Sequence, residues 1–319
     1  MDDNSLFLGI DTSNYTTSVA VVTKDGIAAN IKRLLTVKEG ERGVRQSDAV
    51  FMHTVNLPEL MQKAREYLSN GKLCAIGVSD KPRNPEGSYM PCFLAGVNAA
   101  VTASACASVP LYRFSHQCGH IMAAICSSGA YHLLDHSFAA FHVSGGTTEL
   151  VKVNPSIHGF ETEIVGGTLD LNAGQVIDRI GVRMGLRFPC GPELERLALS
   201  CTSRVPSRKV SYDGTYVNLS GLENIATDCL NKTSDKALAA AIVLNYVADA
   251  LCLMCDKYTE KYGESDFLFA GGVMSNSIIK NKLRSRYSKS YFAEPMLSSD
   301  NAVGIASLAR ACYLNSKLR

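Results

Sequence analysis

The stretch that decides the fold is LFLGIDTSNYTTSVAVV, residues 6–22. Residues 6–10 and 18–22 are apolar and have the composition of two strands. The segment from Asp11 to Thr17 between them is rich in hydroxyl groups. Such a segment between two apolar runs predicts a hairpin with a polar turn.

The same design returns at mid-chain. Residues 138–143 form an apolar run, Ser144-Gly145-Gly146-Thr147-Thr148 provides the turn, and residues 149–153 form the second run. Two copies of one hairpin indicate an internal duplication, which would give two related lobes. Gly, Ser and Thr leave backbone N–H groups and hydroxyls accessible, so both tips are candidates for binding phosphate. The alternative for each tip is an ordinary tight turn.

Helical periodicity fills the intervals between the expected strands. A third Gly-rich element follows the expected strand 267–270, where residues 271–276 (GGVMSN) lead into a helix. Alternating strands and helices with two phosphate-type hairpins predict an α/β protein with a two-lobed, actin-like or sugar-kinase-like (ASKHA) nucleotide-binding fold. The main expected helices are Asp48 to Leu68, Gly96 to Ala107, Asp235 to Tyr262, and a last helix with Ile305, Leu308, Ala309 and Cys312 on one face.

Composition predicts a compact globular protein of the cytoplasm. The chain has 319 residues, 46% of them hydrophobic, and 11 cysteines, an odd number without disulfide-like spacing. We expect most of these to be buried thiols, including Cys252 and Cys255, which follow the helix period. The first residues carry no basic segment, and no apolar run approaches the ~20 residues that span a bilayer. Export and membrane insertion are therefore not expected.

A net charge of +2 neither requires nor excludes a nucleic-acid partner. Any such contact would have to be a local patch. One candidate patch is formed by Lys32, Arg33, Lys38, Arg42 and Arg45, and the alternative is a solvated surface loop.

His116 and His120 stand four residues apart in a segment with helical character, which places both imidazoles on one face. Two such imidazoles can chelate a metal, although a structural histidine pair has the same spacing. In zinc peptidases the first histidine is followed by a glutamate that activates the metal-bound water, whereas this chain has Gln117. Because an amide cannot take up a proton, a metal held here would bind a ligand rather than hydrolyse a peptide.

Taken together, these segments resemble the TsaD family, the tRNA threonylcarbamoyladenosine transferases once described as O-sialoglycoprotein endopeptidases. The resemblance runs along almost the whole chain. The motifs that carry it, in chain order, are His116 to His120, Val143 to Gly146, Asp170 to Asp178, Pro189 to Pro192, Leu219 to Leu222, Ala270 to Asn276 and Ser299 to Asn301.

This resemblance implies the site residues. His116, His120 and Asp300 match the family's metal ligands, for one divalent iron or zinc ion. From the residues alone, Asp300 could equally be a helix N-cap and Asp178 a surface carboxylate. Asp11, in the first tip, is our candidate catalytic residue. The positions that hold the nucleotide part of an ATP or adenylate ligand match His142, Val143, Ser144, Gly145, Gly146, Asp178, Gly191 and Asn276.

The resemblance also implies the reaction. A threonylcarbamoyl, or related carbamoyl, group would pass from an adenylate to an acceptor, by default the tRNA adenosine next to the anticodon, while the metal holds the threonylcarbamoyl end. Implied partners are the adenylate, tRNA, and either a smaller paralogue or a second copy of the chain. The alternatives are a carbamoyltransferase with another acceptor and a non-catalytic nucleotide-binding scaffold, which has no need of three metal ligands. Peptidase activity is not expected.

Departures from the family pattern lie on the acceptor side. Tyr15 and Thr16 stand where the family has two acidic residues, Cys118 replaces a Glu in the metal motif, and Thr147 replaces a His after the Gly pair. A short Gly-Pro-Gly loop is replaced by residues 79–91, whose three prolines predict a fixed, extended loop. We therefore expect a divergent paralogue that keeps the donor chemistry and has a changed acceptor.

The two hairpins set the expected lobes. The first lobe would contain residues 1–115 and 299–319, with the first hairpin. The second would contain residues 116–298, with the metal helix, the second hairpin and the Gly-Gly adenosine motif.

Overall fold

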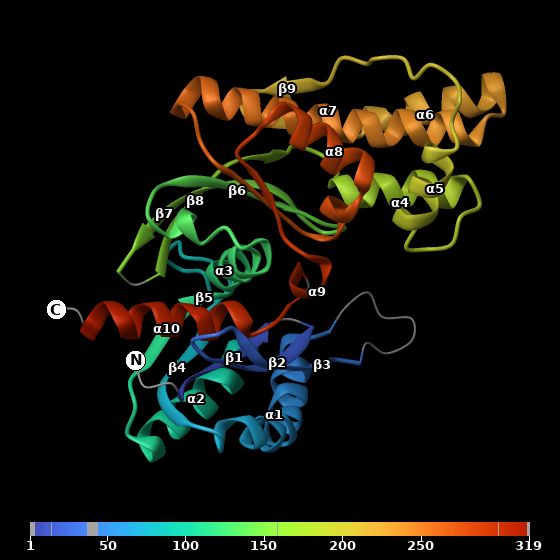
Figure 1. Cartoon of the computed structure of the whole chain (residues 1–319). Coiled ribbons are helices and arrows are strands. Elements are labelled where there is room, and N and C mark those ends of the chain that lie inside the picture. Colours follow the sequence, from blue (N-terminus) through green and yellow to red (C-terminus); the bar gives the residue numbers. More distant parts are fainter. Residues whose placement is uncertain (1–3, 14, 37–43, 158, 299, 318–319) are drawn as a thin grey trace. The chain divides into compact units, whose positions relative to one another are not determined.

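A computed structural model of the chain describes residues 4–13, 15–36, 44–157, 159–298 and 300–317 (Figure 1). The chain divides into two compact units, each with its own sheet. Unit 1 consists of Met1–Tyr131, Asn154–Thr162 and Met296–Arg319, and unit 2 consists of His132–Val153 and Glu163–Pro295.

The sheet of unit 1 has five strands in the order β3-β2-β1-β4-β5. The first three form an antiparallel meander, and β4 and β5 extend the sheet in parallel with β1. Both β1 and β2 are buried along their whole length, which explains why their apolar residues form continuous runs rather than alternate. The strands are β1 (Ser5–Ser13), β2 (Thr16–Val22), β3 (Ile27–Leu34), β4 (Lys72–Lys81) and β5 (Leu111–Ser115).

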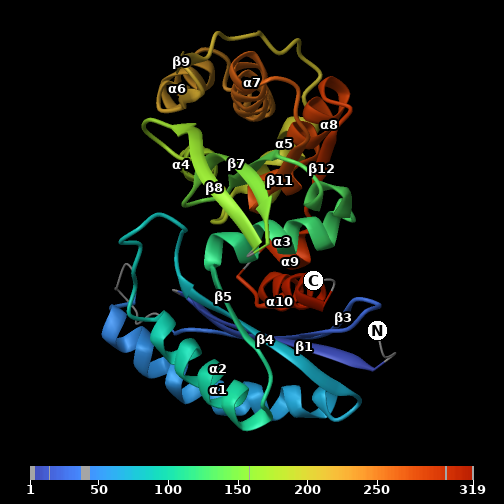
Figure 2. The same ribbon diagram turned by 90° about the vertical axis from the view of Figure 1, so that its left-hand side faces the viewer.

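Helices cover both faces of this sheet (Figure 2). One face packs against α1 and α2, and the other packs against α10. Helix α3 in turn packs against α10. Gly9 and Gly77 permit the close approach of α10, because a Cβ at either position would collide with the backbone of Ala302 or Ile305. The helices are α1 (Gln46–Leu68), α2 (Phe93–Ala107), α3 (His116–Ser128) and α10 (Val303–Lys317), and they confirm the helices expected in these regions.

The sheet of unit 2 has seven strands in the order β12-β11-β6-β7-β8-β10-β9. Its inner strand β6 pairs antiparallel with β7 and parallel with β11, and β11 pairs parallel with β12. In unit 1, β1 pairs in the same ways with β2 and β4, and β4 with β5. This repeated topology is what the two matching hairpins predicted. The strands are β6 (Phe138–Val143), β7 (Thr148–Ser156), β8 (Gly159–Thr168), β9 (Ser211–Asp213), β10 (Tyr216–Asn218), β11 (Phe267–Ala270) and β12 (Ser290–Phe292).

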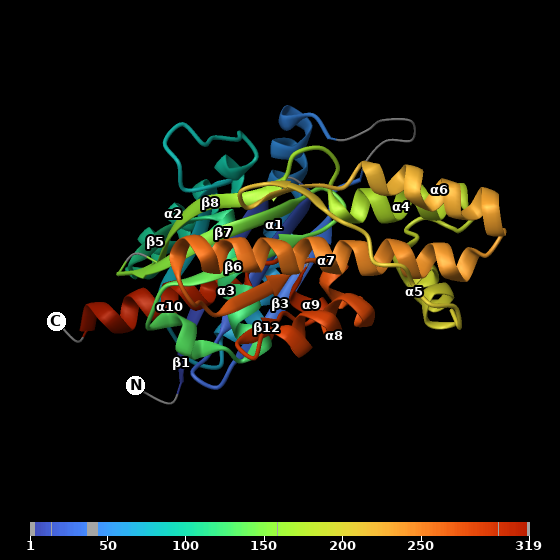
Figure 3. The same cartoon turned by 90° about the horizontal axis from the view of Figure 1, so that it is seen from above.

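The long helix α7 forms the centre of the core of unit 2. It is buried at Leu244, Leu251 and Cys255 and runs beside α6 (Figure 3). Within the described residues it is the one helix long and apolar enough to cross a membrane, and 78% of its most apolar stretch is buried inside the protein. Our expectation that no apolar segment has this length was wrong, because a core helix has the same composition. The helices are α4 (Ala173–Arg183), α5 (Gly191–Leu199), α6 (Gly221–Thr233), α7 (Lys236–Tyr262) and α8 (Ser277–Arg286), with short helices η1 (Tyr131–Leu134), η2 (Gly272–Ser275) and α9 (Pro295–Ser298).

The division between the units differs from the expected lobes of 1–115 plus 299–319 and 116–298. Helix α3, expected in the second lobe, belongs to unit 1 because it packs along α10. Residues 154–162, from the end of β7 and the start of β8, also belong to unit 1, and the chain returns to unit 1 at Met296.

The first hairpin is more closed than we expected. Strands β1 and β2 remain paired as far as Ser13 and Thr16, so Asp11 and Thr12 lie within the ladder and not in an open turn. The second hairpin is as expected, since β6 ends at Val143 and residues 144–147 connect it to β7.

Other expectations from composition can be compared with the structure. All eleven cysteines are free and most are buried, including Cys252 and Cys255 in the core, as predicted. In the basic patch, Arg33 forms an ion pair with Glu59, with 2.6 Å between Nη2 and Oε2. Lys38 and Arg42 lie outside the described residues, so the patch stays a prediction.

Candidate functional site

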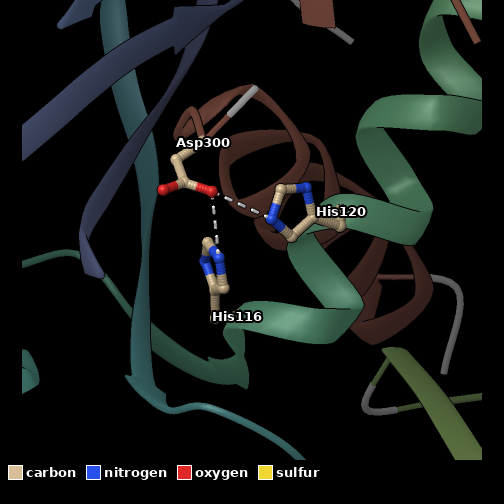
Figure 4. Close-up of side chains that lie close together, drawn as sticks. All are labelled: His116, His120 and Asp300. Atoms are coloured by element: carbon tan, nitrogen blue, oxygen red, sulfur yellow. Dashed lines mark ion pairs between the residues drawn. The ribbon is translucent and has the colours of Figure 1, made fainter. Parts of the chain in front are cut away.

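The three expected metal ligands converge in unit 1 (Figure 4). Asp300 Oδ1 lies 3.4 Å from His116 Nε2 and 3.2 Å from His120 Nε2, and one ligand atom of each residue lies within 4.8 Å of the other two. Ligand atoms that surround one ion at ~2.1 Å are themselves separated by about 3–3.5 Å. The arrangement therefore fits a single ion.

Backbone contact between α3 and α10 produces this convergence. A Cβ on Gly304 would overlap the carbonyl oxygen of Gly119, so the two helices touch at these glycines. Gly119 lies between the two histidines, and Gly304 lies in the first turn of α10, four residues after Asp300. Ser115 caps α3 by accepting a hydrogen bond from the Cys118 N–H at 3.3 Å, which starts the helix at His116.

Asp11 lies behind His116 rather than beside a substrate position. Its Oδ2 lies 2.7 Å from His116 Nδ1, its Oδ1 accepts a hydrogen bond from the Ser13 N–H at 2.7 Å, and the residue is 1% exposed. A carboxylate with both oxygens bonded and closed to solvent is not placed to take a proton from a substrate. The structure thus places Asp11 against the imidazole of His116 and within the β-ladder, not in the open tip where we expected a catalytic group. A carboxylate in this place would hold the Nδ1 proton and leave Nε2 to a ligand.

The charges of this site depend on one another. Burial favours neutral His116, but the Asp11 carboxylate and then Asp300 outweigh it and raise the pKa of His116 to about 10. Burial also opposes ionisation of both carboxyls. The charge of His116 outweighs burial at Asp11, and the charges of His116 and His120 outweigh it at Asp300, so the pKa of each carboxyl is lowered. A metal ion would have to displace the proton of His116.

The neighbouring side chains stay outside the ligand set. Gln117 Oε1 accepts a hydrogen bond from Thr162 Oγ1 at 3.0 Å, and the Cys118 thiol contacts Ser115 Oγ and Asn84 Oδ1. Two imidazoles and one carboxylate with open positions suit divalent iron or zinc, so the residues present fit the implied metal.

Asp300 does not have the alternative role of a helix cap. Asn301 provides that contact, since its Oδ1 accepts a hydrogen bond from the Val303 N–H at 3.0 Å. The loop at 79–91 is held in place, as its prolines predicted. The Pro82 carbonyl accepts from the Gln117 N–H at 3.0 Å, and Asn84 Nδ2 donates to the Phe160 carbonyl at 2.7 Å.

All of the expected nucleotide-binding residues lie in unit 2. We call the surface that they form the nucleotide face. Backbone packing joins their elements. A Cβ on Gly174, at the start of α4, would lie 2.7 Å from the Gly145 backbone, and a Cβ on Gly271 would collide with the backbone of Val143. The face consists of His142 and Val143 at the end of β6, Ser144, Gly145 and Gly146 in the turn, Asp178 on α4, Gly191 at the start of α5, and Asn276 before α8.

Two side chains tie the remaining helices to this face. Asp178 Oδ1 accepts a hydrogen bond from the Cys190 N–H at 2.7 Å, which fixes the start of α5 against α4. Glu195 Oε1 accepts from the Ser277 N–H at 2.7 Å, which fixes α5 against the start of α8. Asn276 is buried and caps α8, since its Oδ1 accepts from the N–H groups of Ile278 and Ile279.

Four glycines of this region have free space where a Cβ would be. Among the described residues, no atom lies within 4 Å of a Cβ placed on Gly145, Gly146, Gly191 or Gly272. Open glycines at a turn and at helix N-termini expose backbone N–H groups, which is the arrangement that binds phosphate.

Sequence reasoning missed Glu195 and the role of Asp170. Asp170 Oδ1 accepts from the Leu219 N–H at 2.8 Å and Oδ2 accepts from the Ser220 N–H at 3.0 Å. This pairing explains why the motif at Leu219 accompanies the motif at Asp170. No local signal marks such contacts, because the partners are 49 and 82 residues apart in the chain.

The repeated topology of the two sheets defines a protein of the actin-like, sugar-kinase-like fold class, and His116, His120 and Asp300 give it a candidate metal site. The family profile of TsaD, described as tRNA N6-adenosine threonylcarbamoyltransferase, matches residues 26–307. The chain belongs to the TsaD family.

Curated relatives match nearly the full length of the chain. The tRNA N6-adenosine threonylcarbamoyltransferase of Bacillus licheniformis is 29% identical over 96% of this chain and 91% of its own length. The protein of the same name from Halalkalibacterium halodurans is 28% identical over 97% of this chain and 91% of its own length.

Solved structures with low sequence identity share the fold. HypF from T. kodakarensis has a TM-score of 0.59 at 14% identity, over 98% of this chain and 48% of that one. Full-length HypF in its phosphate- and nucleotide-bound form has a TM-score of 0.60 at 12% identity, over 100% and 57%. Component A of the Acidaminococcus fermentans (R)-2-hydroxyglutaryl-CoA dehydratase has a TM-score of 0.51 at 14% identity, over 98% of each chain. These likenesses confirm the predicted fold class.

Proposed function

We propose that this chain is a metal-dependent transferase of the cytoplasm that moves a threonylcarbamoyl, or related carbamoyl, group from an adenylate to an acceptor. The default acceptor is the tRNA adenosine next to the anticodon, in keeping with the names of the relatives. The observation that carries the proposal is the convergence of His116, His120 and Asp300 on one point.

Each group of this chain has a task in that reaction. His116, His120 and Asp300 would hold one iron or zinc ion, which would supply a Lewis acid for an oxygen of the transferred group. Asp11 keeps His116 in the tautomer that presents Nε2. In unit 2, the open glycines offer N–H groups to the phosphate of the adenylate, and Asp178 accepts hydrogen bonds from the ribose hydroxyls. No protein nucleophile is needed, because the acceptor amine attacks the carbonyl carbon and AMP leaves.

The first hairpin favours a second candidate, a carbamoyltransferase with another acceptor. Tyr15 is 38% exposed and Thr16 is buried in β2, so neither supplies the carboxylate that the family has at these positions. General-base assistance contributes roughly 10²–10⁴-fold to a rate, so transfer to tRNA by this chain should be slow unless a partner supplies the base. A smaller paralogue or a second copy of the chain is the expected partner. A non-catalytic scaffold would have no use for a carboxylate placed behind a metal ligand.

The test is a transfer assay with the purified, metal-loaded chain. It contains threonine, bicarbonate, ATP, an adenylate-forming enzyme and unmodified tRNA, with and without the partner proteins of a bacterial TsaD, and the tRNA nucleosides are analysed by mass spectrometry. Modification that disappears in His120→Ala supports the tRNA acceptor. Metal and nucleotide binding without modification support another acceptor. A chain that binds neither metal nor nucleotide contradicts the proposal.

A further inference from the structure

Phe188 is a strongly exposed aromatic residue in the segment that joins α4 to α5 in unit 2. Its exposed fraction is 69%, and that of Val182, near the end of α4, is 55%. A single exposed apolar side chain on a loose loop would need no explanation. This segment, however, is firmly held.

Hydrogen bonds fix the backbone on both sides of Phe188. Before it, the Leu186 N–H donates to the Gly181 carbonyl at 2.9 Å, and the Arg187 N–H donates to Glu193 Oε2 at 3.2 Å. After it, the Cys190 N–H donates to Asp178 Oδ1 at 2.7 Å. The ring is thus presented to solvent by a fixed backbone.

The segment runs along the face of α4 that carries Asp178. Asp178, Gly181 and Val182 share this face, because they are three and four residues apart. Cys190 contacts the first two, since a Cβ on Gly181 would overlap its side chain. Gly191, which follows directly, has open space where a Cβ would be. Phe188 therefore lies in a segment whose backbone, two residues further on, contacts the Asp178 carboxylate and leads into the helix N-terminus at Gly191.

We propose that Phe188 is the base-binding platform of the nucleotide face, and that the adenine of ATP or of the adenylate stacks on the Phe188 ring. The inference rests on the proposed function in taking the ligand to be an adenine nucleotide. The nucleotide face is chemically complementary to such a ligand. Asp178 Oδ2 has no hydrogen-bond partner among the described residues and can accept a hydrogen bond from a ribose hydroxyl. A flat apolar ring next to such a carboxylate suits the base, which has a π-face and few charges.

The experiment compares the binding of ATP and of inorganic triphosphate to the full chain by calorimetry, for Phe188→Ala and Phe188→Tyr. Loss of one base-to-aromatic stack weakens binding roughly 5- to 150-fold. Phe188→Ala should therefore lose at least about fivefold in ATP affinity and leave the affinity for triphosphate unchanged. Phe188→Tyr should keep both affinities, because it keeps the ring. The matched control is Leu199→Ala, which removes a side chain that is 65% exposed at the other end of α5 and should change neither.

The outcomes separate this inference from the proposed function. Unchanged ATP affinity in Phe188→Ala, or an equal loss for ATP and triphosphate, would overturn the stacking role, as would a wild-type chain that binds no ATP. Thermal melting of each variant checks the fold, and an exposed side chain should leave it unchanged. A chain that shows the base-specific loss but modifies no tRNA would retain the platform while the tRNA acceptor fails.

Discussion

The two hairpins have one design in sequence and opposite environments in the structure. In the first, the hydroxyl residues are buried, and that of Thr17 bonds within the protein: its Oγ1 lies 2.8 Å from His53 Nδ1 and accepts a hydrogen bond from Asn56 Nδ2 at 3.1 Å. In the second, Gly145 and Gly146 are exposed and have open space around them. The first hairpin is a closed ladder and the second carries an open turn.

The difference teaches what the glycines contribute. Hydroxyl residues fit a β-ladder, so the segment after Asp11, which has no glycine, continues the pairing of β1 and β2 as far as Ser13 and Thr16. In the second hairpin, the pairing of β6 and β7 stops at Val143 and Thr148, and Gly145 and Gly146 lie in the turn between them. The closed hairpin places Asp11 against His116, whereas the open one offers its backbone to a ligand.

The largest expected effect is the loss of metal binding at His116, His120 and Asp300, the site next to the closed first hairpin. His116→Ala and His120→Ala should each reduce the bound metal from a single ion per chain to almost none, because only two ligands remain. ATP binding should persist. The measurement is metal analysis after dialysis. His136→Ala is the matched control, as it removes a histidine that bonds Asp266 in unit 2 and lies outside the ligand set. Full metal content in either ligand variant would show that the pair is structural.

Asp11→Asn tests whether the closed hairpin acts through His116. Removing the carboxylate behind a metal-bound histidine typically lowers metal affinity ~10–100-fold. Competition with a chelator measures this change without an activity assay, and Asp25→Asn, at an exposed turn, is the control. Wild-type affinity in Asp11→Asn would remove the positioning role and leave the closed hairpin without a function in the site.

Gly146→Val tests the open hairpin. The side chain would enter free space, so we expect the free energy of unfolding to change by less than ~0.5 kcal/mol, whereas ATP affinity should fall by about tenfold. Gly174→Ala should instead lower stability, because its Cβ would press on the Gly145 backbone. We expect a loss of about 1–3 kcal/mol in the free energy of unfolding. Chemical unfolding and calorimetry separate the two effects. Unchanged ATP affinity in Gly146→Val would show that the turn does not face the ligand.

The metal-free chain should also show a pH dependence of its stability. Because the pKa of His116 is raised to about 10 in the folded protein, its proton stabilises the fold fully below its ordinary pKa of ~6.5. That stabilisation is lost as pH rises through about 10, so melting temperatures after chelation should fall between pH 7 and 10. The same decline should be absent in His116→Ala. A flat profile in the wild-type chain would mean that the Asp11 and Asp300 carboxylates do not hold this proton.

Much of this protein is already determined by its sequence, because the deciding patterns are local. Continuous apolar runs at 6–10 and 138–143 gave buried strands, and 3.6-residue periodicity gave helices such as α7. The spacing of His116 and His120 placed both on one helical face, whatever the helix packs against. The Gly-Gly turn at Gly145 was open, as expected from its composition.

Only the tertiary structure decided which groups meet. Asp11 and His116 are 105 residues apart, and they are brought together because α3 packs on α10 through Gly119 and Gly304. That contact also places α3 in unit 1, and it makes Asp11, which the sequence suggested as a catalytic group in an open tip, a buried partner of His116. The physical reason is that burial and hydrogen bonding of a carboxylate depend on neighbours from distant parts of the chain, and periodicity along the sequence carries no information about those neighbours.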